Sequence, residues 1–269
     1  MESFSADWLA LREPVDHASR ANGLTARVAE RLRTRVDPRA IDLAAGSGSN
    51  VRYLLPVLPE VTHWTLVDHD PALLAQASRL LTPLAQAAGR AFDVRQGDLQ
   101  ALDTLALDGC ALVTASALLD LVSETWMRAF ARRCREARVD VLCALTYDGR
   151  IVCEPSDGDD RLVRDLVNRH QQTDKGFGVA LGPDAARVAA DCFRDEGFEV
   201  RTARSDWVLD GAHAELQRQL IEGWASAARA MSPADAPAVD AWLARRLSHL
   251  AAGTSRVRVG HIDLAAMAR

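Results

Sequence analysis

The chain has 269 residues, 48% of them hydrophobic, which suits one large α/β domain or one domain with insertions. Its formal net charge is −5 and it lacks a long basic run, which argues against a protein built mainly to bind a nucleic-acid backbone. Its five cysteines form no C-x-x-C pair, so we expect buried free thiols rather than a disulfide scaffold or a metal site. The N-terminus lacks the pattern of a signal peptide and no apolar stretch is long enough to span a bilayer, so we expect a cytoplasmic protein without a membrane partner.

In the first half of the chain, predicted helices alternate with short apolar strands. The expected elements are a helix over 15–35, a strand at 40–43, a helix from Ser49 that stops before Pro56, a strand at 64–68, a helix at 70–88 with Asp70 as its N-cap and Pro71 first in the helix, a strand ending at 95–98, a strand at 110–116, a helix capped by Ser123 and a strand at 139–146. This alternation predicts a mainly parallel sheet with helices on both faces.

The second half departs from that alternation. The expected elements are a helix at 160–171, a glycine-rich loop at 174–178, a helix that starts at 182–184, a sixth strand at 198–208, two helices within 211–251 that are broken at Pro233 and Pro237, and a last strand at 256–264. Roughly 40 residues separate the last two strands, where a plain hairpin needs only a few. This segment is therefore predicted to be an insertion.

Small residues and acids follow three successive predicted strands. The loop from Asp42 to Gly48 reads D-L-A-A-G-S-G, Asp68 ends the second strand, and Asp98 follows the third. Glycines let a ligand approach the backbone, and the carboxyl ends of parallel strands meet at one edge of a sheet. Either acid alone is more typical of a turn or a helix cap. Together with the loop they indicate a site for an adenosine compound, because a carboxylate at Asp68 can accept both ribose hydroxyls.

With these residues the chain resembles the class I S-adenosylmethionine-dependent methyltransferases. The first motif of that family is roughly D/E-x-G-x-G-x-G, and Asp42, Ala44, Gly46 and Gly48 take its fixed positions, with Ala44 in place of the first glycine. The resemblance implies that this loop lines the methionine part of S-adenosyl-L-methionine, the expected cofactor. A dinucleotide-binding loop would need a third glycine where Val51 stands, which argues against a dehydrogenase.

The resemblance also implies contacts along the rest of the cofactor. It assigns ribose binding to Asp68 and its neighbour His69, adenine binding to Asp98 and Leu99, and a place beneath the sulfonium to Ser116.

The fold implied by the resemblance is α/β: a Rossmann-like, doubly wound seven-stranded sheet whose last strand is antiparallel and lies between strands five and six. We expect a single methyltransferase domain over residues 1–269. Within it, residues 36–150 form the cofactor-binding core, residues 1–35 form an N-terminal helical cover, and residues 155–181 and 211–251 form insertions that cap the active site.

The acceptor side of the site has weaker signals. Methyl transfer is an in-line displacement for which the protein mainly supplies orientation and a dry pocket, and a base helps only when a proton must leave. Tyr147, after the fifth strand, and His170, in the insertion helix, are the catalytic candidates; the alternatives are a Tyr-Asp-Gly turn and a surface or helix-capping histidine. The same alternative for a histidine applies to His213 and His261. Arg20 is expected either to bind the methionine carboxylate or to pair with Asp16 on the N-terminal helix.

A covered cavity suits a small or medium methyl acceptor. Trp207, Trp224 and Trp242 either line such a cavity or bury the helices of the insertion. No Asn-Pro-Pro-Tyr motif follows the fourth strand, which argues against methylation of a nucleobase. The predicted function is methyl transfer from S-adenosyl-L-methionine to a small-molecule acceptor by a monomer or homodimer without a nucleic-acid partner. The alternatives are an RNA or protein methyltransferase and a non-catalytic cofactor-binding protein of the same fold.

Overall fold

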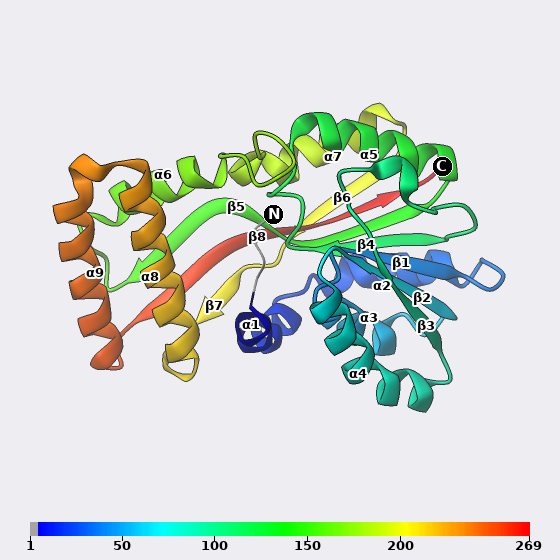
Figure 1. Cartoon of the computed structure of the whole chain (residues 1–269), viewed down its shortest axis with the longest axis horizontal. Helices are drawn as coiled ribbons and strands as arrows, with labels where there is room; N and C mark the ends of the chain where they lie inside the picture. Colours follow the sequence, from blue (N-terminus) through cyan, green and yellow to red (C-terminus); the bar gives the residue numbers. More distant parts are fainter. Residues whose placement is uncertain (1–4) are drawn as a thin grey trace.

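The structure is a computed structural model that describes residues 5–269. Residues 1–4, on which part of the expectation about a signal peptide rests, lie outside the described residues. The strands are β1 (Arg39–Leu43), β2 (His63–Asp68), β3 (Ala91–Gln96), β4 (Leu112–Ser116), β5 (Asp140–Glu154), β6 (Glu199–Arg204), β7 (Trp207–Leu209) and β8 (Arg256–Met267). The helices are α1 (Ala6–Ala18), α2 (Asn22–Leu32), α3 (Ser49–Val57), α4 (Pro71–Ala88), α5 (Glu124–Ala137), α6 (Asp160–Gln171), α7 (Ala185–Asp195), α8 (Ala214–Met231) and α9 (Ala236–Ala251) (Figure 1).

The strands form one sheet in the order β3-β2-β1-β4-β5-β8-β6, with β7 paired to β8. Strands β1 to β5 are parallel, and β8 is antiparallel between β5 and β6. This order confirms the predicted Rossmann-like sheet and the place of its last strand. The predicted sixth strand at 198–208 is wrong, because it is two strands and the sheet therefore has eight. The break falls at Ser205 and Asp206, where the Asp206 carboxylate accepts hydrogen bonds from Arg150 on β5.

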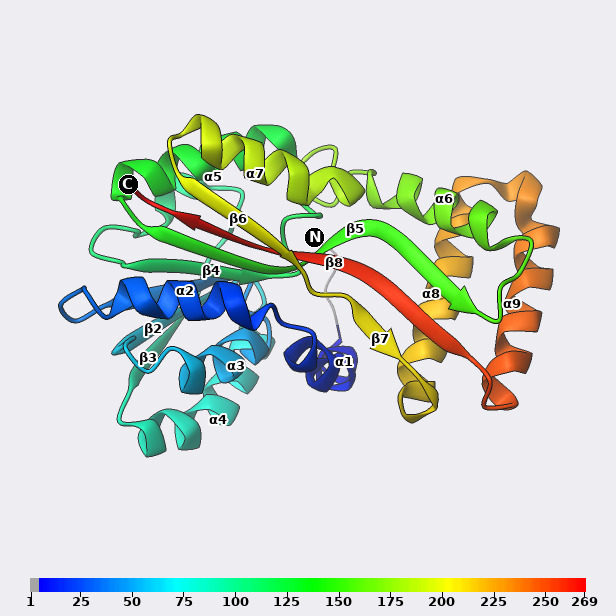
Figure 2. The same cartoon turned by 180° about the vertical axis from the view of Figure 1, so that it is seen from behind.

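Helices cover both faces of the sheet, as predicted. Because side chains alternate along a strand, Val141 and Cys143 of β5 pack against α5 and α7, while Leu142 between them packs on the side of α2, α3 and α4 (Figure 2). The helix caps follow the sequence signals: Asp70 accepts hydrogen bonds from the first turn of α4, and Ser123 caps α5. Helix α3 runs on to Val57, so the predicted stop before Pro56 is wrong. Pro56 lacks the N–H that would donate to the Arg52 carbonyl, and the helix ends one residue after it.

Strands β5 and β8 continue well beyond the sheet as a long antiparallel ribbon, to which β7 adds a short strand (Figure 1). The predicted end of the fifth strand at residue 146 is therefore wrong. Tyr147 pairs with His261 and Glu154 pairs with Arg256, so neither Tyr147 nor the residues after it form a simple turn. The ribbon is irregular near Leu145, which has a positive φ of 55° beside a register shift.

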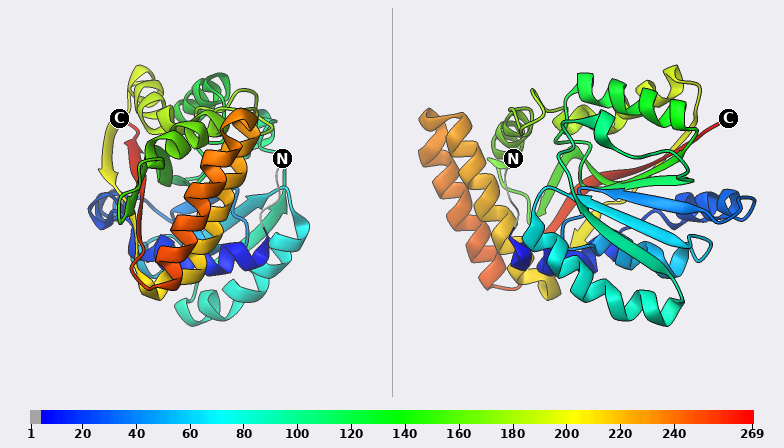
Figure 3. Two further views of the ribbon diagram at one scale, coloured as in Figure 1. Left: turned by 90° about the vertical axis from the view of Figure 1, so that its left-hand side faces the viewer. Right: turned by 45° about the vertical axis from the view of Figure 1, so that its right-hand side comes forward.

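Helices α6, α8 and α9 pack around the far end of this ribbon (Figure 3). Trp242 of α9 is 1% exposed and donates to the Asp160 carboxylate of α6 (2.8 Å). The buried Arg246 guanidinium pairs with the same carboxylate and donates to the carbonyl of Pro155. The ribbon end thus has an apolar core of its own, and Trp242 belongs to it.

The N-terminal segment forms two helices, so the predicted single helix over 15–35 is wrong. Helix α1 ends at Ala18 and α2 begins at Asn22. The turn between them is held by Asp263 of β8, whose carboxylate accepts the backbone N–H of Ala21 (2.9 Å). Helix α1 consequently lies where the ribbon leaves the sheet (Figure 1).

Three general features of residues 5–269 bear on function. None of their helices is long and apolar enough to cross a membrane. They contain no group of three or more His, Cys, Asp and Glu side chains that could hold a metal ion. The five cysteines are free thiols, four of them buried and Cys110 half-buried.

Candidate functional site

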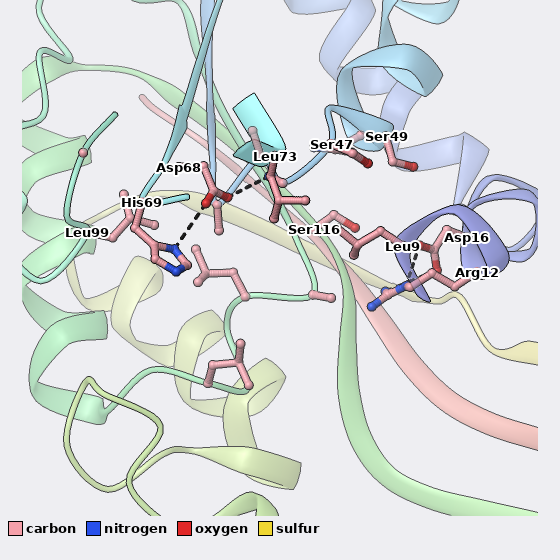
Figure 4. A pocket seen from close by; sticks show the side chains of 18 of the residues that line it. Leu9, Arg12, Asp16, Ser47, Ser49, Asp68, His69, Leu73, Leu99 and Ser116 are labelled. Carbon is pink, nitrogen blue, oxygen red and sulfur yellow. Dashed lines mark hydrogen bonds and ion pairs between the residues drawn. The ribbon is translucent and has the colours of Figure 1, made fainter. Parts of the chain in front are cut away.

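A cavity lies at the carboxyl ends of β1, β2 and β4 and is covered by the N-terminal helix (Figure 4). We call it the strand-end cavity. Of the predicted cofactor residues, those that line it are Arg20, Ala44, Gly46, Asp68, His69, Leu99 and Ser116. Leu9 and Arg12 of α1 line the same cavity, so the predicted helical cover and the strand ends meet at one place.

The fold holds the Asp68 carboxylate in place on the wall of this cavity. Its Oδ2 accepts the N–H of Gly46 (2.7 Å), its Oδ1 accepts the N–H of Asp70 (2.9 Å), and the His69 ring nitrogen lies 3.2 Å from Oδ1. The side chain is 5% exposed. A carboxylate has about four lone-pair sites, so Asp68 keeps capacity to accept hydrogen bonds from a ligand.

The loop after β1 uses left-handed backbone. Ala44, Gly46 and Gly48 have φ values of 51°, 52° and 81°. A Cβ at Gly46 would lie 3.3 Å from Leu9, so this glycine lets α1 approach the loop closely. A Cβ at Gly48 would lie 3.0 Å from Leu81 of α4, which places Gly48 at a helix contact rather than on the cavity wall.

Asp42 lies behind the cavity and is completely buried. Its Oδ1 accepts hydrogen bonds from Asn50 Nδ2 and Thr114 Oγ1, both at 2.6 Å. Burial raises the pKa of Asp42 to about 6. The Asn50 carbonyl in turn accepts from Arg20 Nη1 (2.7 Å), so Asp42 positions the amide that holds Arg20.

Arg20 lies in the turn between α1 and α2, and its side chain is 2% exposed. The guanidinium lies over the Tyr53 ring at 4.5 Å, and Nε is 3.7 Å from Asp263 Oδ2. Its Nε and Nη2 donate no hydrogen bond to any group within residues 5–269. Asp16, the alternative partner, pairs with Arg12 instead (2.8 Å). A buried guanidinium with free donors on a cavity wall suits a carboxylate.

Helix α1 is anchored on both sides. Arg52 of α3 donates from Nε to the Glu13 carboxylate (2.7 Å). On the other side, Asp16 accepts the indole N–H of Trp207 from β7 (3.0 Å). The helix therefore bridges the sheet and the ribbon.

Two of the predicted adenine contacts differ in their surroundings. Leu99 is buried and lines the cavity, and its carbonyl accepts the indole N–H of Trp126 (2.7 Å). Asp98 is exposed, is absent from the cavity wall and accepts the N–H of Gln100 (2.9 Å).

A second cavity adjoins the first and lies between α1, α6, α8 and the β5–β8 ribbon. We call it the ribbon cavity. Arg12, Ala117 and Leu121 line both cavities, so the two are neighbours. Trp207 and Trp224 are buried and line the ribbon cavity, so they both pack in the core and form part of a cavity wall.

Both predicted catalytic residues, Tyr147 and His170, line the ribbon cavity. The Tyr147 hydroxyl donates to Asn168 Oδ1 (2.7 Å), and burial raises the pKa of the phenol, so this side chain is protonated at neutral pH. His170 Nδ1 lies 3.5 Å from the ammonium of Lys175, the only lysine of the chain. The structure thus brings these residues together, away from the cofactor motif.

Sequence reasoning missed Asp120, a titratable group of the ribbon cavity, and discounted a second one, His261. Burial raises the pKa of Asp120 to about 6, although hydrogen bonds from the backbone of Asp120 and Tyr147 oppose it. Burial, followed by the nearby Arg12, lowers the pKa of His261 to about 3, so its imidazole is neutral. Within the described part of the chain, Asp120 Oδ1 and His261 Nδ1 are buried and have no hydrogen-bond partner. The only sequence signal for Asp120 was an acid in the apolar run after the fourth strand.

No protein-family model matches the sequence, and no curated protein matches it. Among solved structures, the cyclopropane synthase MmaA2 from Mycobacterium tuberculosis is similar over 97% of this chain and 94% of its own, with 12% identity and a TM-score of 0.53. The YcgJ protein from Bacillus subtilis is similar over 92% of this chain and 99% of its own, with 13% identity and a TM-score of 0.52.

A third solved structure is an S-adenosylmethionine-dependent methyltransferase from Geobacter sulfurreducens in complex with S-adenosyl-L-homocysteine. It aligns over 100% of both chains, with 15% identity and a TM-score of 0.49. At these identities the comparisons show the fold alone: the chain has a Rossmann-like fold that it shares with the cyclopropane synthase and the YcgJ protein.

Proposed function

We propose that this protein transfers a methyl group from S-adenosyl-L-methionine to a small-molecule acceptor by in-line displacement. The observation that carries the proposal is that Arg20 and Asp68 line one cavity at the strand ends of a Rossmann-like sheet. The free donors of a buried guanidinium suit the carboxylate of the methionine part, and a held carboxylate suits the ribose hydroxyls.

The residues of the strand-end cavity fit the cofactor. Gly46 places loop backbone on the cavity wall, Leu99 offers an apolar surface for adenine, and Ser116 lies at the end of β4 where the sulfonium is expected. Bound there, the cofactor supplies an electrophilic methyl group. His69 and Ala44 are proposed as further contacts, and Asp98 stays a predicted adenine contact.

The ribbon cavity is the proposed acceptor site. It adjoins the strand-end cavity, and its wall contains buried tryptophans from β7 and α8. Such a cavity favours a compact apolar acceptor over an RNA or protein chain. Tyr147 and His170 are proposed to orient the acceptor. The expectations of a cytoplasmic location, of a single domain and of a monomer or homodimer stay predictions.

Calorimetry with S-adenosyl-L-methionine and S-adenosyl-L-homocysteine tests the proposal. We expect micromolar affinity, and Asp68→Ala is expected to weaken it by about 100-fold or more, because charge-assisted hydrogen bonds to the ribose are lost. Asp103→Ala, an exposed acid after β3, is the matched control and should keep the affinity. If the folded wild-type protein binds neither compound, the proposed function is wrong.

A second measurement separates the acceptor classes. Protein incubated with methyl-labelled cofactor and a cell extract should move the label into the small-molecule fraction. Label in RNA or protein would favour the alternative acceptors instead, and no label in any fraction would favour the non-catalytic alternative.

A further inference from the structure

The ribbon cavity contains a carboxylate oxygen that the fold leaves without a partner. Asp120 is 8% exposed and lines the cavity, yet its Oδ1 accepts no hydrogen bond from residues 5–269. An unsatisfied buried acceptor costs about 1–3 kcal/mol, and the large majority of buried polar atoms have partners. A carboxylate kept in this state on a cavity wall is available to a ligand that donates a hydrogen bond.

Asp120 also lies where the two cavities meet. It belongs to the segment after β4, and Ala117 and Leu121 of that segment line both cavities. The segment is held in place, because the Asp120 carbonyl accepts the N–H of Gly182 (2.9 Å). An acceptor atom must lie close to both the transferred methyl group and the group that receives its proton, and this junction meets that requirement.

The charged and titratable groups that line the ribbon cavity with Asp120 are Arg12 of α1, Tyr147 of β5, His170 of α6, Lys175 of the following loop and His261 of β8, whereas the residues of α8 and β7 on its wall are uncharged. The Tyr147 phenol is protonated and donates to Asn168, and His261 with its pKa of about 3 is a weak base. Guanidinium and ammonium groups offer donors only. Asp120 and His170 are left as possible proton acceptors, and of these Asp120 lies beside the strand-end cavity.

The apolar residues of the ribbon cavity indicate which kind of acceptor skeleton fits it. Trp8, Trp207 and Trp224 line the cavity together with Leu145 and Val167. Flat rings and branched aliphatic groups favour an apolar, planar molecule, which stacks on indoles without needing many polar contacts.

We propose that Asp120 binds the O–H or N–H of an acceptor with an aromatic or other apolar skeleton and takes its proton during methyl transfer. The inference rests on the proposed function. In the step, the acceptor oxygen or nitrogen forms a bond to the methyl carbon while the carbon–sulfur bond breaks with its electron pair remaining on sulfur. The O–H or N–H bond breaks and its proton passes to Asp120 Oδ1, then to solvent.

Binding of two matched probes to protein loaded with S-adenosyl-L-homocysteine tests the contact without turnover. The probes are p-cresol and its methyl ether, 4-methylanisole, and the tryptophans of the wall report binding by fluorescence. Wild-type protein is expected to prefer p-cresol by about 10-fold, which is the effect of one hydrogen bond to a charged group. Asp120→Leu should remove this preference, and Asp195→Leu, on the exposed end of α7, should keep it.

Equal binding of the two probes by wild-type protein, a preference that survives in Asp120→Leu, or no binding of either probe would overturn the contact. In each case S-adenosyl-L-homocysteine still binds, which distinguishes this failure from a failure of the proposed function. Asp120→Leu is checked for folding by its affinity for S-adenosyl-L-homocysteine, which should stay within about twofold of wild type.

Label transfer from S-adenosyl-L-methionine to p-cresol tests the proton step. The rate should rise with pH to a plateau above about 6, because the carboxylate must be ionised. Asp120→Asn should lower the rate by about 100-fold or more and remove this pH limb. Bound p-cresol that receives no label from wild-type protein, or an unchanged rate in Asp120→Asn, would refute the assignment; loss of the pH limb in His170→Gln instead would make His170 the base.

Discussion

The two cavities differ in the kind of polar atom that the described residues leave without a partner. In the strand-end cavity, Asp68 accepts two backbone N–H groups and Arg20 is held by Asn50, but Nε and Nη2 of Arg20 remain unpaired donors. In the ribbon cavity, the unpaired buried atoms are Asp120 Oδ1 and His261 Nδ1. The first cavity is built by strand ends that the fold brings together, whereas the second is enclosed by α1, α6, α8 and the β5–β8 ribbon. The proposed cofactor site thus lies at the edge of the sheet, and the proposed acceptor site lies between the ribbon and its helices.

The largest expected effect is a loss of stability when the apolar core of the ribbon end is disrupted. Trp242→Ala is expected to destabilise the protein by about 3–5 kcal/mol, because it empties a packed site and removes the hydrogen bond to Asp160. Thermal unfolding measures the loss, with Ser248→Ala, an exposed position on the same helix, as control. At a temperature where the variant stays folded, affinity for S-adenosyl-L-homocysteine should be retained. If the folded variant lost this affinity, the strand-end cavity would depend on the packing of the ribbon end.

Acid should lower the stability of the protein through His261 of β8, in the ribbon. Its pKa is about 3 in the folded protein against about 6.5 when unfolded, so the unfolded chain binds more protons between these values and stability falls as pH decreases through 6.5. Near pH 4.5 this amounts to about 2–3 kcal/mol. Asp42 and Asp120, whose pKa values are raised, act in the opposite direction, so wild type and His261→Gln must be compared at each pH.

Denaturant unfolding at pH 7 and pH 4.5 gives that comparison. We expect the stability difference between the two pH values to be smaller in His261→Gln by this amount. An identical pH dependence in the two proteins would mean that His261 is protonated in the folded state.

A smaller, more selective effect is expected in the strand-end cavity. Arg20→Met should weaken S-adenosyl-L-homocysteine binding by about 10–30-fold, because a charge-assisted hydrogen bond to the carboxylate is lost. Binding of 5′-methylthioadenosine, which lacks the amino-acid part, should change little. Calorimetry with both compounds measures the contrast. An equal loss for both would mean that Arg20 supports the cavity as a whole rather than the methionine end.

Local signals and the family resemblance predicted most of the fold, and long-range contacts account for what they missed. Helix α4 begins at Pro71 after its Asp70 cap and ends before Gly89, as its residues indicate. The break between α1 and α2 depends on Asp263, which is 242 residues from Ala21. The length of β5 likewise depends on its pairing with β8, and the sequence of β5 does not specify that partner.

The site shows the same contrast. The motif brings Gly46 and Asp68 to one cavity, as expected for neighbouring strand ends. Arg20 lines the same cavity, although it lies in a turn rather than on the predicted helix. Asp120 carried no motif, because its burial and its free oxygen result from segments that meet only in the folded chain.

Three residues other than glycine line the two cavities in left-handed backbone. Ala44 lines the strand-end cavity, Leu145 lines the ribbon cavity and Ala117 lines both, with φ between 51° and 55°. An L-residue in this region costs about 1–2 kcal/mol, and such strain persists only where surrounding structure holds it. The sheet edge proposed to receive ligands thus holds three of the five non-glycine residues with positive φ among residues 5–269. Selection for greater thermal stability would act first on these positions. Glycine there would relieve the strain, but it would also loosen the cavity walls that the strained backbone shapes.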